Sequence, residues 1–157
     1  VRRPRDGFFL RAESYFNVAT QIERLDEEDL PAARIGPVYS DRKLHEQSHG
    51  ESFLALFTNR FFGRGLYLLD EPEAALSPTR QLAVLSRLHQ LVEQDSQFII
   101  ATHSPILLAY PRARIYQLDD EGVHQVAYEE TEHFVVTRQF LDDHQRMLRL
   151  LLEEDDT

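Results

Sequence analysis

The pattern of hydrophobic and polar residues divides the chain into short apolar runs and one long helical segment. Apolar runs at residues 7–11, 66–69 and 98–101 predict three strands, and the last two are typical of buried parallel strands. Between these two, apolar residues recur at helical spacing after Ser77 and Pro78, which suit an N-cap and the first helical position. The order strand, helix, strand predicts an α/β fold with a right-handed crossover and a mainly parallel sheet.

The remaining segments have weaker patterns. Residues 115–118 and 123–128 flank an acidic turn and predict a late β-hairpin, and residues 136–154 predict one or two helices. Nearer the N-terminus, we expect a helix over residues 14–25 and a loop or irregular insertion over residues 26–41.

Composition changes this picture in three respects. The 157 residues, 42% hydrophobic and 28% charged, are typical of one soluble globular domain. The absence of cysteine excludes disulfides and thiolate metal sites. Neither a secretory signal nor an apolar run long enough to cross a membrane is visible in the sequence. We therefore expect a cytoplasmic protein without a membrane segment. The net charge of −10 argues against non-specific adhesion to nucleic acid, while a local basic patch remains open.

Two adjacent carboxylates, Asp70 and Glu71, follow the strand at residues 66–69. In open α/β sheets, ligands bind at the carboxyl ends of the strands. There, Asp70 can hold Mg²⁺, partly through water, and Glu71 can orient or deprotonate the water that attacks a γ-phosphate. The alternative is a strand that ends in a solvated acidic turn.

Two further features bear on this choice. His103 follows the strand at residues 98–101, so we expect it near Asp70 and Glu71, where it can donate a hydrogen bond to a phosphate oxygen. A predicted helix start at Ser48 and Gly50 is suited to an anion. It is equally consistent with an ordinary N-cap in which Ser48 and Glu51 form a capping box.

In combination, four motifs resemble the C-terminal half of an ABC-type ATPase. They are Ser-His-Gly-Glu at 48–51, Leu-Tyr-Leu-Leu-Asp-Glu-Pro-Glu at 66–73, Ala-Leu-Ser-Pro at 75–78 and Ala-Thr-His-Ser-Pro at 101–105. The chain is most similar to stand-alone, AAA-labelled predicted ATPases related to the SMC and recombination-repair group, over residues 7–152. The resemblance implies a P-loop NTPase fold, ATP and Mg²⁺ as ligands, ATP hydrolysis, and a homodimer that sandwiches ATP between two copies.

The resemblance also assigns roles to individual residues. By this resemblance, Ser48, Gly50 and Glu51 belong to the signature motif, and Ser77 belongs to the D-loop, which lines the dimer interface. Glu71 is the catalytic glutamate and His103 is the switch histidine. The metal ligands that it implies are Asp70, the Walker B aspartate, and Glu13, which lies near the position of the Q-loop. The chain departs from the family pattern in the signature motif, where His49 replaces a glycine, and in the Q-loop, where the glutamine is absent.

The largest departure is the absence of a P-loop. No Gly-x-x-x-x-Gly-Lys-Ser/Thr motif occurs, and none of the six glycines precedes Lys43, the only lysine, at the required spacing. A P-loop supplies the backbone cradle and the lysine that bind phosphate. We therefore interpret residues 1–157 as a partial ABC-type domain whose P-loop half lies upstream. We expect this chain alone to be inactive and to expose apolar sheet.

Other interpretations remain open at this point. A nucleotide-gated binding or signalling module with negligible turnover is the main alternative, although Glu71 favours hydrolysis. A metal-hydrolase site built on Asp70, Glu71 and His103 lacks further ligands, and a DExx-box helicase fits the motif order less well. The family resemblance keeps nucleic acid open as a partner.

Overall fold

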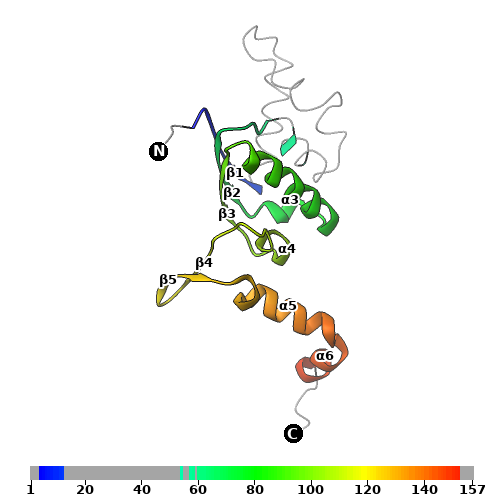
Figure 1. The fold of residues 1–157 in the computed structure, drawn as a ribbon. Coiled ribbons are helices and arrows are strands. Elements are labelled where there is room, and N and C mark those ends of the chain that lie inside the picture. Colours follow the sequence, from blue (N-terminus) through cyan, green and yellow to red (C-terminus); the bar gives the residue numbers. More distant parts are fainter. Residues whose placement is uncertain (1–3, 13–53, 55–56, 59, 153–157) are drawn as a thin grey trace. The chain divides into compact units, whose positions relative to one another are not determined.

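The computed structural model describes residues 4–12, 54, 57–58 and 60–152 of the chain (Figure 1). These residues belong to two compact units, Val1–Leu107 and Leu108–Thr157, which are described separately. The helix expected over residues 14–25 and the loop expected over residues 26–41 lie outside the described residues.

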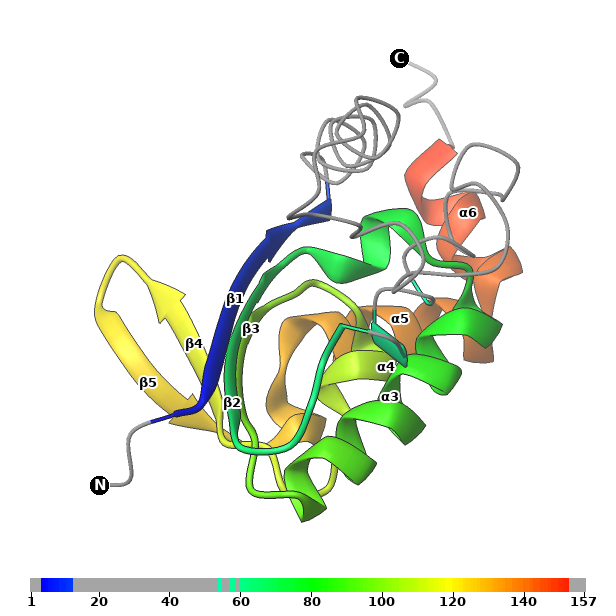
Figure 2. The same cartoon turned by 90° about the horizontal axis from the view of Figure 1, so that it is seen from above.

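The first unit is built on a parallel three-stranded sheet. The strands are β1 (Asp6–Arg11), β2 (Gly65–Asp70) and β3 (Gln97–Ala101), in the order β1-β2-β3. Helix α3 (Pro78–Glu93) connects β2 to β3 and runs along one face of the sheet (Figure 2). The predicted strand–helix–strand order and the α/β fold class are confirmed.

Helix α3 begins where the sequence predicts. Ser77 is its N-cap, with an extended backbone and a hydroxyl oxygen that accepts a hydrogen bond from the backbone N–H of Arg80 at 3.4 Å. Pro78 occupies the first turn, where its missing N–H has no intrahelical partner to lose. The cap and the proline together fix the start of the helix eight residues after the end of β2.

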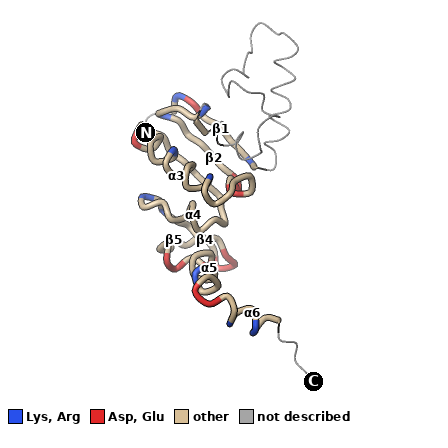
Figure 3. The backbone as a smooth tube through the Cα atoms, turned by 90° about the vertical axis from the view of Figure 1, so that its right-hand side faces the viewer, with Lys and Arg blue, Asp and Glu red and all other residues tan. Residues whose placement is uncertain are grey.

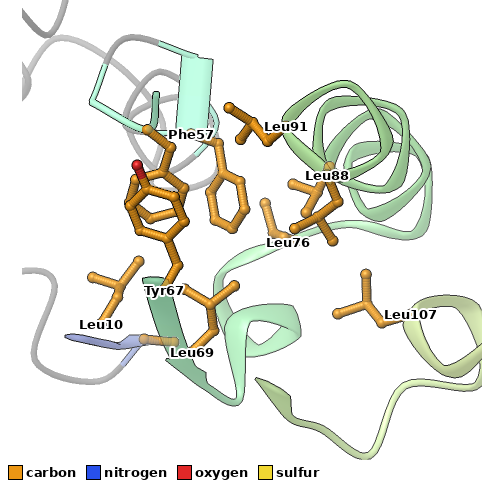
Figure 4. Close-up of a cluster of buried hydrophobic side chains, with 11 residues drawn as sticks. Leu10, Phe57, Tyr67, Leu69, Leu76, Leu88, Leu91 and Leu107 are labelled. Carbon is orange, nitrogen blue, oxygen red and sulfur yellow. The ribbon is translucent and has the colours of Figure 1, made fainter. Parts of the chain in front are cut away.

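The hydrophobic core lies between α3 and one face of the sheet (Figure 4). Alternation along β2 turns Tyr67 and Leu69 toward this core, and Leu88 and Leu91 of α3 point toward them. Burial of one such side chain stabilises the fold by about 1.5–3 kcal/mol. The other buried hydrophobic residues of the cluster are Leu10, Ala12, Phe57, Phe61, Leu76, Val84 and Leu107.

The opposite face of the sheet is exposed. Phe9, Leu68 and Ile99 are neighbours in the strand register, and their exposed fractions are 62%, 37% and 56%. The prediction that β2 and β3 are fully buried strands is therefore wrong for this face, because α3 covers only the other one. The expectation that the chain exposes apolar sheet is confirmed by the same three side chains.

A polar network lies at the start of the sheet, at the end opposite Asp70. Two guanidinium nitrogens of Arg60 donate to the two carboxylate oxygens of Asp6, at 2.6 and 3.2 Å. The buried Tyr67 hydroxyl accepts from the backbone N–H of Phe62 at 2.8 Å and lies 3.2 Å from the Asp6 carboxylate. Hydrogen bonding from Arg60 lowers the pKa of Asp6, partly offset by burial, and burial raises the pKa of Tyr67.

Replacing Asp6 should change how stability depends on pH. Because its pKa is lower in the folded chain, ionised Asp6 stabilises the fold above its unfolded pKa of about 4, and this contribution is lost as pH falls through the folded pKa. We expect Asp6→Asn to lower the free energy of unfolding at about pH 7 by about 1–3 kcal/mol and to flatten its decline below about pH 4. Urea unfolding across this range, with the exposed Asp120→Asn as control, measures both effects. Identical profiles for wild type and Asp6→Asn would contradict the prediction.

The second unit contains a β-hairpin followed by helices. The hairpin consists of β4 (Ile115–Asp119) and β5 (Gly122–Val126), as predicted, and Gly122, the first residue of β5, has a φ of 130°. A short 3-10 helix, α5 (Glu132–Asp142) and α6 (His144–Leu152) follow. None of the helices that the structure describes has the length and hydropathy needed to cross a bilayer.

Candidate functional site

The candidate site lies at the carboxyl edge of the parallel sheet. Arg11, Asp70 and Ala101 are the last residues of β1, β2 and β3, and the strand register places them side by side. This is the edge at which open α/β sheets bind ligands. The prediction that the ends of β2 and β3 meet is confirmed.

Glu71 has an unusual backbone conformation directly after β2. Its φ of 47° and ψ of 51° place it in the left-handed region, which residues other than glycine adopt rarely. Two backbone hydrogen bonds hold it there: its N–H donates to the Ala101 carbonyl at 2.9 Å, and the Ala74 N–H donates to the Glu71 carbonyl at 3.0 Å. Such conformations persist only where surrounding structure fixes them, and they concentrate at functional sites.

The Glu71 carboxylate lies beside the His103 imidazole. His103 Nε2 and Glu71 Oε1 are 3.4 Å apart, and the side chains are 71% and 47% exposed. Because both groups are open to solvent, the carboxylate can take a proton from water while the imidazole can donate a hydrogen bond to a neighbouring group. The predicted proximity of the two residues is confirmed, and their catalytic roles stay predictions.

Asp70 forms an ion pair that sequence reasoning missed. Arg11 Nε lies 2.6 Å from Asp70 Oδ2, and the Asp70 side chain is 28% exposed. Among the described residues, no group of three or more possible ligands could hold a metal ion. One carboxylate at the sheet edge still fits Mg²⁺, which keeps several waters and takes further oxygens from phosphate. Mg²⁺ would therefore compete with Arg11 for Asp70.

A second missed feature holds the loop after β3 in place. Glu73 lies in the 3-10 helix η3 (Pro72–Ala75), and its Oε1 accepts from the backbone N–H of His103 at 2.6 Å. On the other side, the buried Ser104 hydroxyl donates to the Gln81 side-chain carbonyl at 2.5 Å. One signal was present in the sequence, because Glu73 completes the Asp-Glu-Pro-Glu motif. The Arg11–Asp70 pair had none, because it depends on the pairing of β1 with β2.

The other predicted site residues are placed only in part. Ser48, Gly50, Glu51 and Glu13 lie outside the described residues. Ser77 is exposed and caps α3, which agrees with the predicted helix start and does not test its role at a dimer interface.

Comparison with protein families identifies the fold to which this edge belongs. Residues 10–109 match the family described as "AAA domain, putative AbiEii toxin, Type IV TA system". The chain belongs to this AAA-domain family. The matched residues include β2, α3 and β3 with the candidate site between them, so the α/β unit is a P-loop NTPase-like fold of the ABC and AAA ATPase type.

Similarity to a curated protein points to the same class. The chain is 32% identical over 83 residues to an uncharacterized ABC transporter ATP-binding protein of Haemophilus influenzae. The match covers 52% of this chain and 32% of that protein, so the chain spans about a third of the relative's length. No solved structure matches.

Basic residues are dispersed over the described elements. Figure 3 shows Arg residues scattered among the described strands and helices, interspersed with Asp and Glu.

Proposed function

We propose that this AAA-domain chain forms part of an ATP-hydrolysing engine that dimerises around ATP. The observation that carries the proposal is the Glu71 carboxylate, held in a left-handed backbone beside His103 at the edge where Asp70 ends β2. A fixed carboxylate with solvent access next to a predicted Mg²⁺ ligand is suited to positioning the water that attacks a phosphoryl group.

Each residue at the edge has a distinct task in this proposal. When bound, Mg²⁺ and ATP supply the polarised γ-phosphoryl group. Asp70 holds the ion, Glu71 orients the attacking water and takes its proton, and His103 donates a hydrogen bond to a phosphate oxygen. The proposal further includes Glu13 as a metal ligand and Ser48, Gly50, Glu51 and Ser77 as nucleotide contacts across the dimer.

The proposal assigns the phosphate cradle to residues outside these 157, because no P-loop motif occurs among them. A P-loop contributes several backbone N–H donors and a lysine, and hydrogen bonds to a charged group are each worth about 1.5–3 kcal/mol. We therefore expect the 157-residue chain to bind ATP at least about 100-fold more weakly than a chain extended upstream to include a P-loop. Titration of a fluorescent ATP analogue with Mg²⁺ into both chains measures the difference.

The same titration can refute this division of labour. Equal affinity for the two chains would mean that residues within the 157 form a complete phosphate site, and the roles assigned above would have to be redrawn. A control titration without Mg²⁺ shows whether binding depends on the ion, as a site that includes Asp70 requires.

One observation favours a second candidate function. Arg11 pairs with Asp70 at 2.6 Å and so neutralises the carboxylate that would hold Mg²⁺. A protein in which this pair persists would bind nucleotide with little turnover and act as a nucleotide-gated binding or signalling module. Turnover by wild type and by Glu71→Gln distinguishes the two candidates.

A further inference from the structure

Glu73 connects the segment after β2 to the loop that carries His103. Its Oε1 accepts the His103 backbone N–H at 2.6 Å across thirty residues of sequence. A hydrogen bond to a charged acceptor is shorter and about twice as strong as one between neutral groups. This contact therefore fixes the backbone of His103 directly.

The second oxygen of the same carboxylate is buried without a partner. Glu73 Oε2 is the one buried side-chain polar atom that lacks a hydrogen-bond partner among the residues that the structure describes. Leaving a charged oxygen in this state is unfavourable for stability, since buried polar groups are normally paired. A residue kept only to stabilise the fold would not need a charge at this position.

The loop is also held from the opposite side. Gln81 accepts a hydrogen bond from Ser104 Oγ and donates from its amide nitrogen to the Leu76 carbonyl at 3.1 Å. Gln81 and Ser104 are 8% and 6% exposed, so these bonds are shielded from water. Gln81 of α3 anchors Ser104, the residue that follows His103. The hydrogen bond to Glu73 then sets the position of the His103 backbone itself.

We propose that Glu73 is a positioning residue that sets the place of His103 relative to Glu71. It acts through the His103 backbone, and its buried Oε2 without a hydrogen-bond partner lowers stability in exchange for that placement. The catalytic consequence rests on the proposed ATP hydrolysis, whereas the placement itself is a property of this chain.

The placement is tested in the 157-residue chain without nucleotide. In Glu73→Met, which removes both carboxylate oxygens, the His103 amide proton should shift upfield in ¹⁵N–¹H NMR spectra. Its hydrogen exchange should become about 10- to 100-fold faster, the range that corresponds to loss of one charge-assisted hydrogen bond. Glu73→Gln keeps an acceptor oxygen and should restore most of the protection. Glu93→Ala, at the exposed end of α3, is the control and should leave the His103 amide unchanged.

The consequence for catalysis is tested in the full-length protein. Glu73→Met should lower kcat for ATP hydrolysis by about 10- to 100-fold, with KM for ATP changed less than about twofold, because a displaced group weakens the chemical step rather than binding. Glu73→Gln should recover part of kcat. The urea midpoint of Glu73→Met should be unchanged or higher, which separates positioning from a stabilising role.

The outcomes distinguish this proposal from the proposed function. An unchanged His103 amide in Glu73→Met, or a lowered urea midpoint with kcat unchanged, overturns the positioning role. If wild type hydrolyses no ATP, the proposed function fails, and the amide measurement alone then decides whether Glu73 places His103.

Discussion

Glu71→Gln lowers kcat for ATP hydrolysis by about 10²- to 10³-fold in the full-length protein and leaves ATP affinity within about threefold. The glutamine amide has nearly the shape of the carboxylate, so the left-handed backbone and its bonds to Ala101 and Ala74 are retained. It cannot accept a proton from water, which is the task that the proposal gives to Glu71. Phosphate release under steady-state conditions measures kcat, and equilibrium titration measures affinity.

Two controls make this result specific. Glu93→Gln removes the same charge from the exposed end of α3 and should leave kcat unchanged. His103→Gln removes the imidazole that lies 3.4 Å from Glu71 and should lower kcat while Glu71 remains. Equal inactivity of wild type and Glu71→Gln, combined with ATP-dependent dimerisation, would contradict hydrolysis and favour the nucleotide-gated module.

The strands and their functional ends could be predicted from the sequence because both depend on local patterns. An apolar run that ends in Asp70 and Glu71, one helix, and a second run that ends before His103 leave few possible arrangements. Parallel strands then bring these ends to one edge whatever the details of packing. The predicted site geometry therefore follows from chain order.

The missed residues depend on register and side-chain packing, which a hydrophobic pattern does not specify. Arg11 reaches Asp70 only because β1 pairs with β2 in one register. Glu73 reaches His103 only because η3 turns the chain back toward the end of β3. Similarly, apolar content alone could not show that Leu68 and Ile99 face away from α3 and are exposed.

Phe61→Ala is expected to destabilise the first unit by about 3–5 kcal/mol, the range for truncating a buried phenylalanine. Phe61 is fully buried, stacks on Tyr67 with ring centroids 4.3 Å apart, and contacts Phe57 at 4.7 Å. Its ring also lies 5.9 Å from Phe8 of β1 and 6.4 Å from Phe98 of β3, so it touches residues from all three strands. Domains of this size are stable by only about 5–15 kcal/mol, so the loss is a large part of the total.

The adjacent Phe62 provides a matched control for this substitution. Its side chain is 53% exposed, and its contacts with the Tyr67 hydroxyl use backbone atoms that alanine retains. We expect Phe62→Ala to lower the free energy of unfolding by less than about 1 kcal/mol. Urea unfolding followed by far-ultraviolet circular dichroism measures the free energy of unfolding of each variant. The two variants are matched because each replaces one phenylalanine by alanine. Similar losses for both would mean that the aromatic cluster around Phe61 is not the centre of this core, because Phe61 is fully buried in that cluster whereas Phe62 is half-exposed.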